Sequence, residues 1–212
     1  FDIRGDSVSL NHHYFGNINV NSEWDNSESS FKLTLLNILN DSIPLRASGF
    51  YKPSDNYLSI NADLNNLQPK FFETFLTDIV SETTGGVTGN LLLSGKTDKL
   101  NLTGRNVQLN NLSFKVDFTN FFYTLNGPVN LTETGLFVNN AIIKDMAGNS
   151  GRVNGGLQYK HFRDLRLSTV INFNNLEALN TREEDNSSFY GTAFGTGRLS
   201  ISGPLDKILM DI

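Results

Sequence analysis

The chain has 212 residues, of which 38% are hydrophobic and 11% aromatic, enough for a folded core. Asp and Glu number 22 against 17 Lys and Arg, and this acidic balance argues against a nucleic-acid partner, since phosphate binding needs a basic surplus. There is no cysteine, which excludes disulfide stapling and Cys-ligated zinc. No stretch approaches the roughly 20 apolar residues of a membrane-spanning helix.

The composition favours an all-β fold. Asn is very abundant, with 28 residues, while Lys and Glu, which are common on helix surfaces, are sparse. Asn, Ser, Thr and Gly between β-branched and aromatic residues are typical of a polar sheet face and its turns. Residues 1–67 alternate between apolar and polar positions and predict half-buried antiparallel strands, with apolar pairs or runs at Val8/Leu10, Ile18/Val20, Phe31/Leu33/Leu35 and 57–64.

One helix is predicted, near 69–81, with Pro69 in its first turn. Its apolar residues recur at helical spacing and form a wide aromatic face: Phe71, Phe72, Phe75, Leu76, Ile79 and Val80. We interpret this face as a plug for the core or for an open end of the β-structure. A membrane-binding or partner-binding helix is the alternative.

Strands dominate again from residue 85. The alternating apolar residues of 85–212 predict one continuous apolar face, which would line a groove. The predicted groove residues are Leu91, Leu93, Leu100, Leu102, Phe114, Val116, Phe118, Leu165, Leu167, Ile171, Phe173, Leu199 and Ile201. Alternation alone leaves open whether such a sheet forms an open trough or a closed sandwich.

An internal repeat indicates how the chain is organised. Gly89 and Gly95 stand six residues apart, as do Gly197 and Gly203, and each second Gly is followed by Asp-Lys and an apolar residue. The period is 197 − 89 = 108 residues. We therefore expect two copies of one unit, roughly 1–104 and 105–212, in a fragment of a longer repetitive β protein.

No motif indicates catalysis. Gly95-Lys96-Thr97 resembles the end of a phosphate-binding loop, but that loop needs a Gly at the position held by Asn90. His12 and His13 are adjacent, so on a strand they point to opposite faces and cannot join His161 in one metal site. We expect no catalytic, cofactor-binding or metal site, and no enzyme.

The region 85–212 resembles the C-terminal region of the TamB family, the translocation-and-assembly-module subunit of the AsmA-like superfamily, in its Bacteroidota style. The segments that carry the resemblance are GLFVNNAIIKDMAGNSG at 135–151, NFNNL at 172–176 and FYGTAFGTGRLSISGP at 189–204. The resemblance implies a long antiparallel β-sheet curled into a taco or half-pipe with an apolar concave face. The predicted helix near 69–81 has no counterpart that we can assign.

The resemblance also implies a function. Family members lie in the periplasm of the Gram-negative cell envelope, and the full-length protein is anchored in the inner membrane outside this fragment. They are associated with phospholipid transport and outer-membrane biogenesis beside an Omp85-type outer-membrane barrel protein. We therefore expect an apolar groove that conducts phospholipid acyl chains or shields outer-membrane protein clients. A β-rich surface adhesin or glycan-binding module is the alternative.

Overall fold

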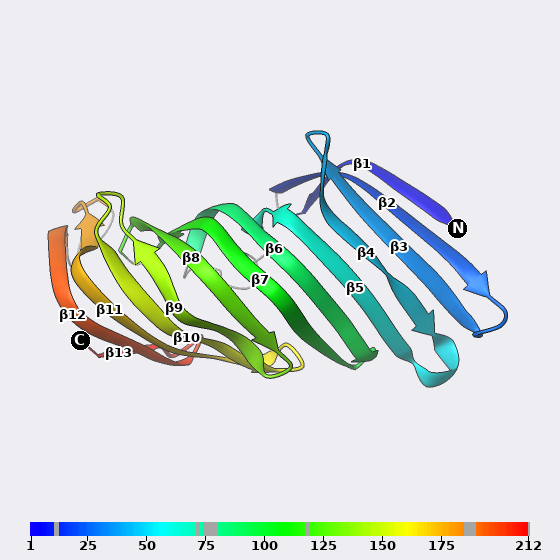
Figure 1. Cartoon of the computed structure of the whole chain (residues 1–212). Helices are drawn as coiled ribbons and strands as arrows, with labels where there is room; N and C mark the ends of the chain where they lie inside the picture. Colours follow the sequence, from blue (N-terminus) through cyan, green and yellow to red (C-terminus); the bar gives the residue numbers. More distant parts are fainter. Residues whose placement is uncertain (11–12, 71–72, 74–79, 118, 185–189, 212) are drawn as a thin grey trace.

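The computed structural model describes residues 1–10, 13–70, 73, 80–117, 119–184 and 190–211 (Figure 1). These residues form one antiparallel sheet of 13 strands, in which each strand pairs with the next along the chain. The strands are β1 (Asp2–Leu10), β2 (His13–Asp25), β3 (Ser30–Leu39), β4 (Ser42–Lys52), β5 (Tyr57–Leu67), β6 (Val80–Lys96), β7 (Lys99–Val116), β8 (Phe121–Thr132), β9 (Gly135–Lys144), β10 (Ser150–Lys160), β11 (Arg163–Thr181), β12 (Gly191–Pro204) and β13 (Leu209–Asp211). The all-β antiparallel prediction is confirmed.

Tight turns produce this consecutive order. The two-residue β3–β4 turn has positive φ at Asn40 and Asp41, as a type I′ hairpin requires. Successive turns lie at opposite ends of the strands. We call the ends that carry the β2–β3, β4–β5, β6–β7, β8–β9, β10–β11 and β12–β13 turns the lower rim, and the opposite ends the upper rim.

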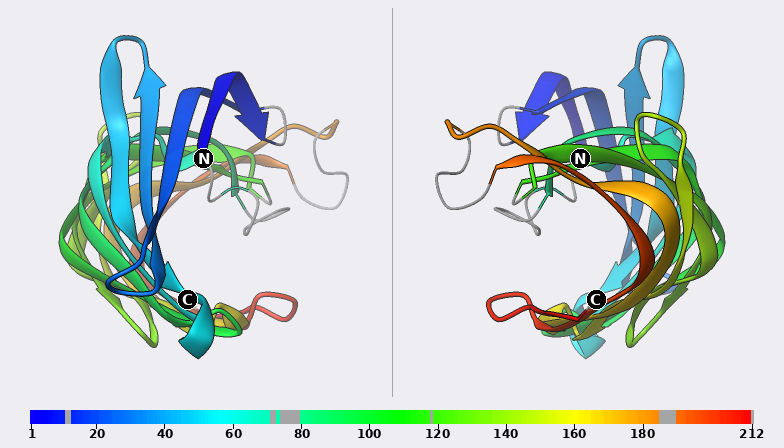
Figure 2. Two further views of the ribbon diagram at one scale, coloured as in Figure 1. Left: turned by 90° about the vertical axis from the view of Figure 1, so that its right-hand side faces the viewer. Right: turned by 90° about the vertical axis from the view of Figure 1, so that its left-hand side faces the viewer.

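The sheet curls around an open channel, and it does not close (Figure 2). Viewed along its length, the strands follow an arc with a concave inner side and a convex outer side. The first and last strands, β1 and β13, have no pairing with each other. The described residues thus form a single curved layer.

No α-helix occurs among the described residues, and most of the helix predicted near 69–81 lies outside them. Phe71, Phe72, Phe75, Leu76 and Ile79 lie outside that part of the chain. Pro69, Lys70 and Glu73 have 3-10 conformation, and a separate 3-10 turn, Pro53–Asp55, precedes β5. Val80, predicted as the end of the helix, instead begins β6, where it pairs with Val116.

A step of 108 residues along the sequence corresponds to a step of six strands along the sheet. In the β5–β6 ladder, Leu58 lies opposite Gly95, and in the β11–β12 ladder, Leu167 lies opposite Gly203. The Asn-Asn-Leu segments end in Leu67 of β5 and Leu176 of β11, and both ladders have a register shift just before that Leu. Strands β5 and β6 therefore recur in register as β11 and β12. The expected boundary between 104 and 105 falls inside β7.

Asn residues at positive φ occur where strands carry an extra residue. Asn66, Asn106, Asn111, Asn140 and Asn175 all have φ between 47° and 58°, and each lies within a register shift of its ladder. Such a shift is a β-bulge, which increases the bend and twist of the strand. Asn tolerates this left-handed conformation better than most residues. The abundant Asn thus has a specific place in the curled sheet.

Several bulges share one further contact. The backbone N–H of the positive-φ residue donates to the side chain of the single residue opposite the bulge. Asn111 donates to Asn126 Oδ1 at 2.7 Å, and Asn140 donates to Asn154 Oδ1 at 2.8 Å. The same contact joins Ser7 to Asn17 and Asn175 to Thr196. The opposing side chain replaces the ladder bond that the bulge removes.

Replacing such an opposing residue should weaken the sheet measurably. We expect Asn154→Ala to lower the free energy of unfolding by about 1 kcal/mol, because the N–H of Asn140 loses its acceptor. The matched control is Asn139→Ala, since Asn139 is exposed in the same bulge and has ordinary φ. Urea unfolding followed by circular dichroism measures both. Equal losses in the two variants would contradict this role of Asn154.

Candidate functional site: the inner face of the sheet

The strand register places the predicted groove residues that are described on one face of the sheet. Residues directly opposite in antiparallel strands point to the same side, as do residues two apart on one strand. Leu93 lies opposite Leu102, and Ile171 lies opposite Leu199. The remaining predicted positions follow through the intervening ladders: Leu91, Leu100, Phe114, Val116, Leu165, Leu167, Phe173 and Ile201. Phe118 lies outside the described residues.

A hydrogen bond across the curl identifies this face as the concave one. Tyr123 lies opposite Phe114, so it shares the face of the predicted residues. Its hydroxyl donates to the backbone oxygen of Glu177 on β11, at 2.6 Å. Strands β9 and β10 lie between β8 and β11 in the sheet. Side chains can make such a contact only across the inside of the curve, and we call this side the inner face.

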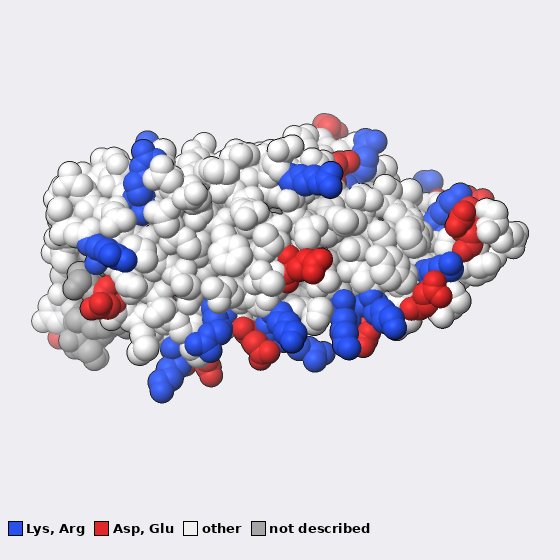
Figure 3. Space-filling model, turned by 60° about the horizontal axis from the view of Figure 1, so that its bottom comes forward, with Lys and Arg blue, Asp and Glu red and all other residues white. Residues whose placement is uncertain are grey.

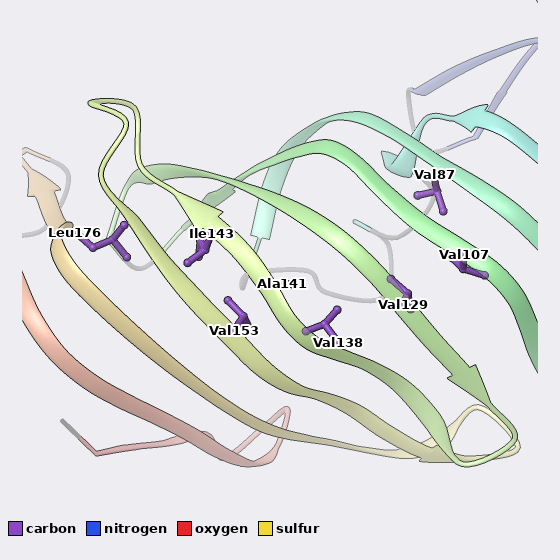
Figure 4. Close-up of a cluster of buried hydrophobic side chains, with 8 residues drawn as sticks. All are labelled: Val87, Val107, Val129, Val138, Ala141, Ile143, Val153 and Leu176. Carbon is purple, nitrogen blue, oxygen red and sulfur yellow. The ribbon is translucent and has the colours of Figure 1, made fainter.

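The best-buried part of the inner face lies between β6 and β11 (Figure 4). It is a cluster of small and medium apolar side chains that the sequence-based set does not include: Val87, Val107, Val129, Val138, Ala141, Ile143, Val153 and Leu176. Val107, Ala141 and Leu176 each directly follow a positive-φ Asn of a bulge. For these three residues, the sequence signal was therefore an Asn immediately before an apolar residue.

The upper rim is bridged at the C-terminal side of the sheet. The backbone N–H of Asn180 donates to the oxygen of Thr119, at 3.5 Å, close to the Tyr123–Glu177 bond. Burial of the hydroxyl, followed by the nearby carboxylates of Glu177 and Asp145, raises the pKa of Tyr123 to about 12. Its hydroxyl therefore stays protonated near neutral pH and serves as a donor across the channel.

A buried carboxylate supports this bridge. Asp145, in the β9–β10 turn, is 6% exposed and accepts hydrogen bonds from the backbone N–H of Glu177 at 3.0 Å. It also accepts from the backbone and side-chain nitrogens of Asn149, both at 2.8 Å. Burial raises the pKa of Asp145, but the bonds from Asn149, Glu177 and Ala147 outweigh it, so the pKa is lower than usual. Asp145 thus connects the β9–β10 turn to β11 as an ionised acceptor.

The pKa of Glu177 is shifted in the opposite direction from that of Asp145. It is 8% exposed, and burial together with the charge of Asp145 raises the pKa of its carboxyl group. Its contribution to the bridge comes from its backbone, which donates to Asp145 and accepts from Tyr123. The side chain is therefore a buried acid beside a second acid, and its charge opposes folding.

The lower rim carries mixed charges at its hairpin turns. A cleft of about 350 Å³ lies between the β6–β7 and β10–β11 turns, and its lining residues are Asp98, Lys99, Lys160, His161, Arg163 and Asp164. In the view of Figure 3, Lys and Arg are interspersed with Asp and Glu along the lower margin of the molecule. Much of the surface above this margin is uncharged. The lower rim is thus polar.

The described residues contain no group of three or more His, Cys, Asp or Glu that could hold a metal ion. No helix in that part of the chain has the length and apolar character needed to cross a membrane. Comparisons with protein-family models, curated proteins and solved structures found no match for this chain. The functional argument therefore depends on the inner face alone.

Proposed function

We propose that the inner face is a groove that binds acyl chains and conducts phospholipid along the sheet. The observation that carries the proposal is a row of apolar side chains along the concave side of a single curved sheet. All the described members of the predicted groove set are half-buried. Within the described part of the chain, neither of the usual covers, a second sheet or an α-helix, lies over this face.

Acyl chains suit such a surface energetically. Each methylene that moves from water to an apolar environment gains about 0.8 kcal/mol, so even partial coverage of one chain outweighs a modest ordering cost. The curl removes water from several sides of a bound chain, while the charged lower rim leaves room for a hydrated headgroup. These features support a lipid path with an apolar floor and a polar margin.

The segment before β6 belongs in the same proposal. The carboxylate of Glu73 accepts hydrogen bonds from the backbone nitrogen and hydroxyl of Thr83, at 2.5 and 2.6 Å. These bonds hold Glu73 beside the bulged start of β6, near the upper rim. We propose that this segment covers part of the inner face and limits access to it.

A charge on the groove should stop lipid binding while the same charge on the outer face should not. Leu167 is half-buried on the inner face near the lower rim, and Ser168 is its exposed neighbour on the outer face. We expect Leu167→Arg to abolish most photo-crosslinking to a phospholipid bearing a diazirine in its acyl chain. An arginine there reaches water with its head but interrupts the apolar path.

The control is Ser168→Arg, which adds the same charge on the opposite face and should crosslink like the parent chain. Circular dichroism must show that both variants are folded. Equal crosslinking of the two variants would reject the groove, whatever its absolute level. A weakened outer-membrane barrier in cells that carry Leu167→Arg in the full-length protein would support lipid transport by the groove in the cell.

The cellular setting of this proposal comes from the resemblance to the TamB family. We propose that the chain is a segment of a periplasm-spanning protein anchored in the inner membrane and working beside an Omp85-type outer-membrane barrel protein. Shielding of outer-membrane protein clients on the same groove is part of that proposal. Co-purification of the full-length protein with such a barrel would support it, and retention in the cytoplasm would reject it.

A glycan-binding module is the second candidate, and one observation favours it. Phe50 and Tyr57 are exposed on the outer face, and their rings stack with centroids 6.3 Å apart. Exposed aromatic rings with polar neighbours can bind sugar rings. Binding to a glycan array that is lost in Phe50→Ala, with no lipid crosslinking, would move the assignment to this function.

A further inference from the structure

Two hairpins of the lower rim end in a pair of opposed cations. At its turn, the β6–β7 ladder ends with Lys96 opposite Lys99, and the β10–β11 ladder ends with Lys160 opposite Arg163. The ladders at the other four lower-rim turns end in Asp25 with Ser30, Lys52 with Tyr57, Thr132 with Gly135 and Ser202 with Leu209. Like charges directly opposite each other destabilise an antiparallel ladder. The two cation pairs therefore oppose the folding of the hairpins that carry them.

The chain itself does not neutralise these cations. None of the ion pairs in the described part of the chain involves Lys96, Lys99, Lys160 or Arg163. All four side chains are exposed. The whole chain has a net charge of −5, so this local concentration of positive charge differs from its overall balance. An anionic group bound between the two hairpins would offset the repulsion within both pairs.

The cleft of about 350 Å³ at the lower rim lies between these same two hairpins. The β8–β9 turn stands between them in the sheet and is recessed. Gly135, the first residue of β9, lies opposite Gln158, so the end of β10 and the β10–β11 turn extend past it. On the other side, β7 begins at Lys99, eight residues before its first pair with β8 at Val107, whereas β8 continues only three residues past that pair. The two projecting hairpins thus form the walls of the cleft.

Charges of both signs line this cleft. The lining consists of three cations, two carboxylates and one imidazole: Lys99, Lys160, Arg163, Asp98, Asp164 and His161. Lys and Arg side chains bind phosphate oxygens well, but the two carboxylates would repel a ligand with negative charge alone. An ammonium group on the same ligand would bind those carboxylates. The lining therefore suits a small zwitterion in which a phosphate group and an ammonium group lie close together.

We propose that this cleft binds a phosphoethanolamine group, carried by a phospholipid as its headgroup or by a soluble phosphodiester. Lys99, Lys160 and Arg163 bind the phosphodiester oxygens, while Asp98 and Asp164 accept hydrogen bonds from the primary ammonium group. A cleft of about 350 Å³ is large enough for a small ligand. A phospholipid as the carrier rests on the proposed groove, but binding of the headgroup itself does not.

A headgroup without acyl chains tests the site separately from the groove. The probe is glycerophosphoethanolamine, and its binding is followed by an NMR titration of the backbone amides of the whole chain. We expect it to bind several-fold more tightly than glycerophosphoglycerol, which has no ammonium group. It should also bind more tightly than glycerophosphocholine, whose quaternary ammonium has no N–H to donate to the carboxylates. Equal binding of the three compounds would overturn the proposal, because the cleft would then recognise phosphate alone.

A matched pair of variants locates the binding. We expect Lys160→Gln to weaken the binding of glycerophosphoethanolamine several-fold, because one of the cations that line the cleft is lost. This variant should unfold at no lower urea concentration than the parent chain, since the repulsion with Arg163 is also removed. The control is Lys52→Gln, because Lys52 precedes Lys160 by one 108-residue repeat and lies opposite Tyr57. Equal binding by the two variants would contradict the proposed site.

Crosslinking to phospholipids with a diazirine in the acyl chain identifies the carrier. The parent chain should crosslink phosphatidylethanolamine more strongly than phosphatidylglycerol, and Lys160→Gln should lose this preference. No crosslinking to either lipid, with glycerophosphoethanolamine still bound, would reject the groove and support a soluble phosphodiester as the ligand. Equal crosslinking of the two lipids to the parent chain, with no binding of glycerophosphoethanolamine, would support the groove and overturn the headgroup site.

Discussion

Gly155→Ala should lower the free energy of unfolding by about 3 kcal/mol, although it adds only one methyl group. Gly155 lies in β10, which pairs along both sides, and its φ is +114°, which side chains rarely adopt. A Cβ at this position would lie 2.0 Å from the backbone oxygen of Ser168. The new methyl group therefore needs both a strained backbone and a shift of β11.

The control for this substitution is Gly197→Ala. A Cβ at Gly197 would meet no atom within 4 Å, and its φ lies outside the left-handed region. We expect a change within about 0.5 kcal/mol, since the backbone already suits alanine. Chemical denaturation of both variants decides the issue. A loss at Gly155→Ala no larger than that at Gly197→Ala would mean that β10 and β11 adjust freely.

Period-2 alternation predicts the sheet well wherever strands are regular. From Leu165 to Phe173 every second residue points to the inner face, and the ladder to β12 has no shift over this stretch. Alternating apolar and polar residues are sufficient there to assign each side chain to a face, because a one-residue slip of the strand would expose the whole apolar set. The fold class and strand direction therefore follow from the sequence.

The same rule fails at bulges. Leu109 and Leu112 are three residues apart and share the inner face, because the shift at Asn111 inserts an extra residue. Strict alternation would assign Leu112 to the outer face. Leu102 and Phe114 are an even number apart because two bulges lie between them and their effects cancel. Asn is common in turns, so the sequence predicts a turn at each Asn-Asn pair and does not reveal that the pair lies inside a strand.

The C-terminal end of the predicted helix shows a second limit. The spacing of aromatic residues after Pro69 suits a helix, and nothing local distinguishes its end from the start of a strand. Val80 joins β6 because a long-range ladder to β7 is available, and it lies opposite another valine. Tertiary pairing thus overrides a local period. Neither the bridge of Tyr123 to Glu177 nor the role of Asp145 could be predicted, since both unite strands distant in sequence.

The bridge at the upper rim should make stability depend on pH in two opposite ways. Asp145 has a lowered pKa in the folded chain, so its contribution is present above the unfolded pKa and is lost as the pH falls through the folded value. Glu177 has a raised pKa, so its favourable contribution exists below the unfolded pKa and is lost as the pH rises through the folded value. The two residues can therefore be separated by titration.

We expect Asp145→Ala to lower the free energy of unfolding by about 3 kcal/mol at pH 7, because the buried N–H of Glu177 and the half-buried nitrogens of Asn149 lose a charged acceptor. This difference from the parent chain should shrink in acid, below the ordinary carboxyl range. Glu177→Gln should instead stabilise the chain at pH 7, since it removes a buried charge beside Asp145, and its advantage should vanish in acid. Urea midpoints measured from pH 7 down to well below pH 3 test both. A loss for Asp145→Ala that stays constant with pH, or a Glu177→Gln variant less stable than the parent at pH 7, would show that the bridge is held by packing rather than by the Asp145 carboxylate.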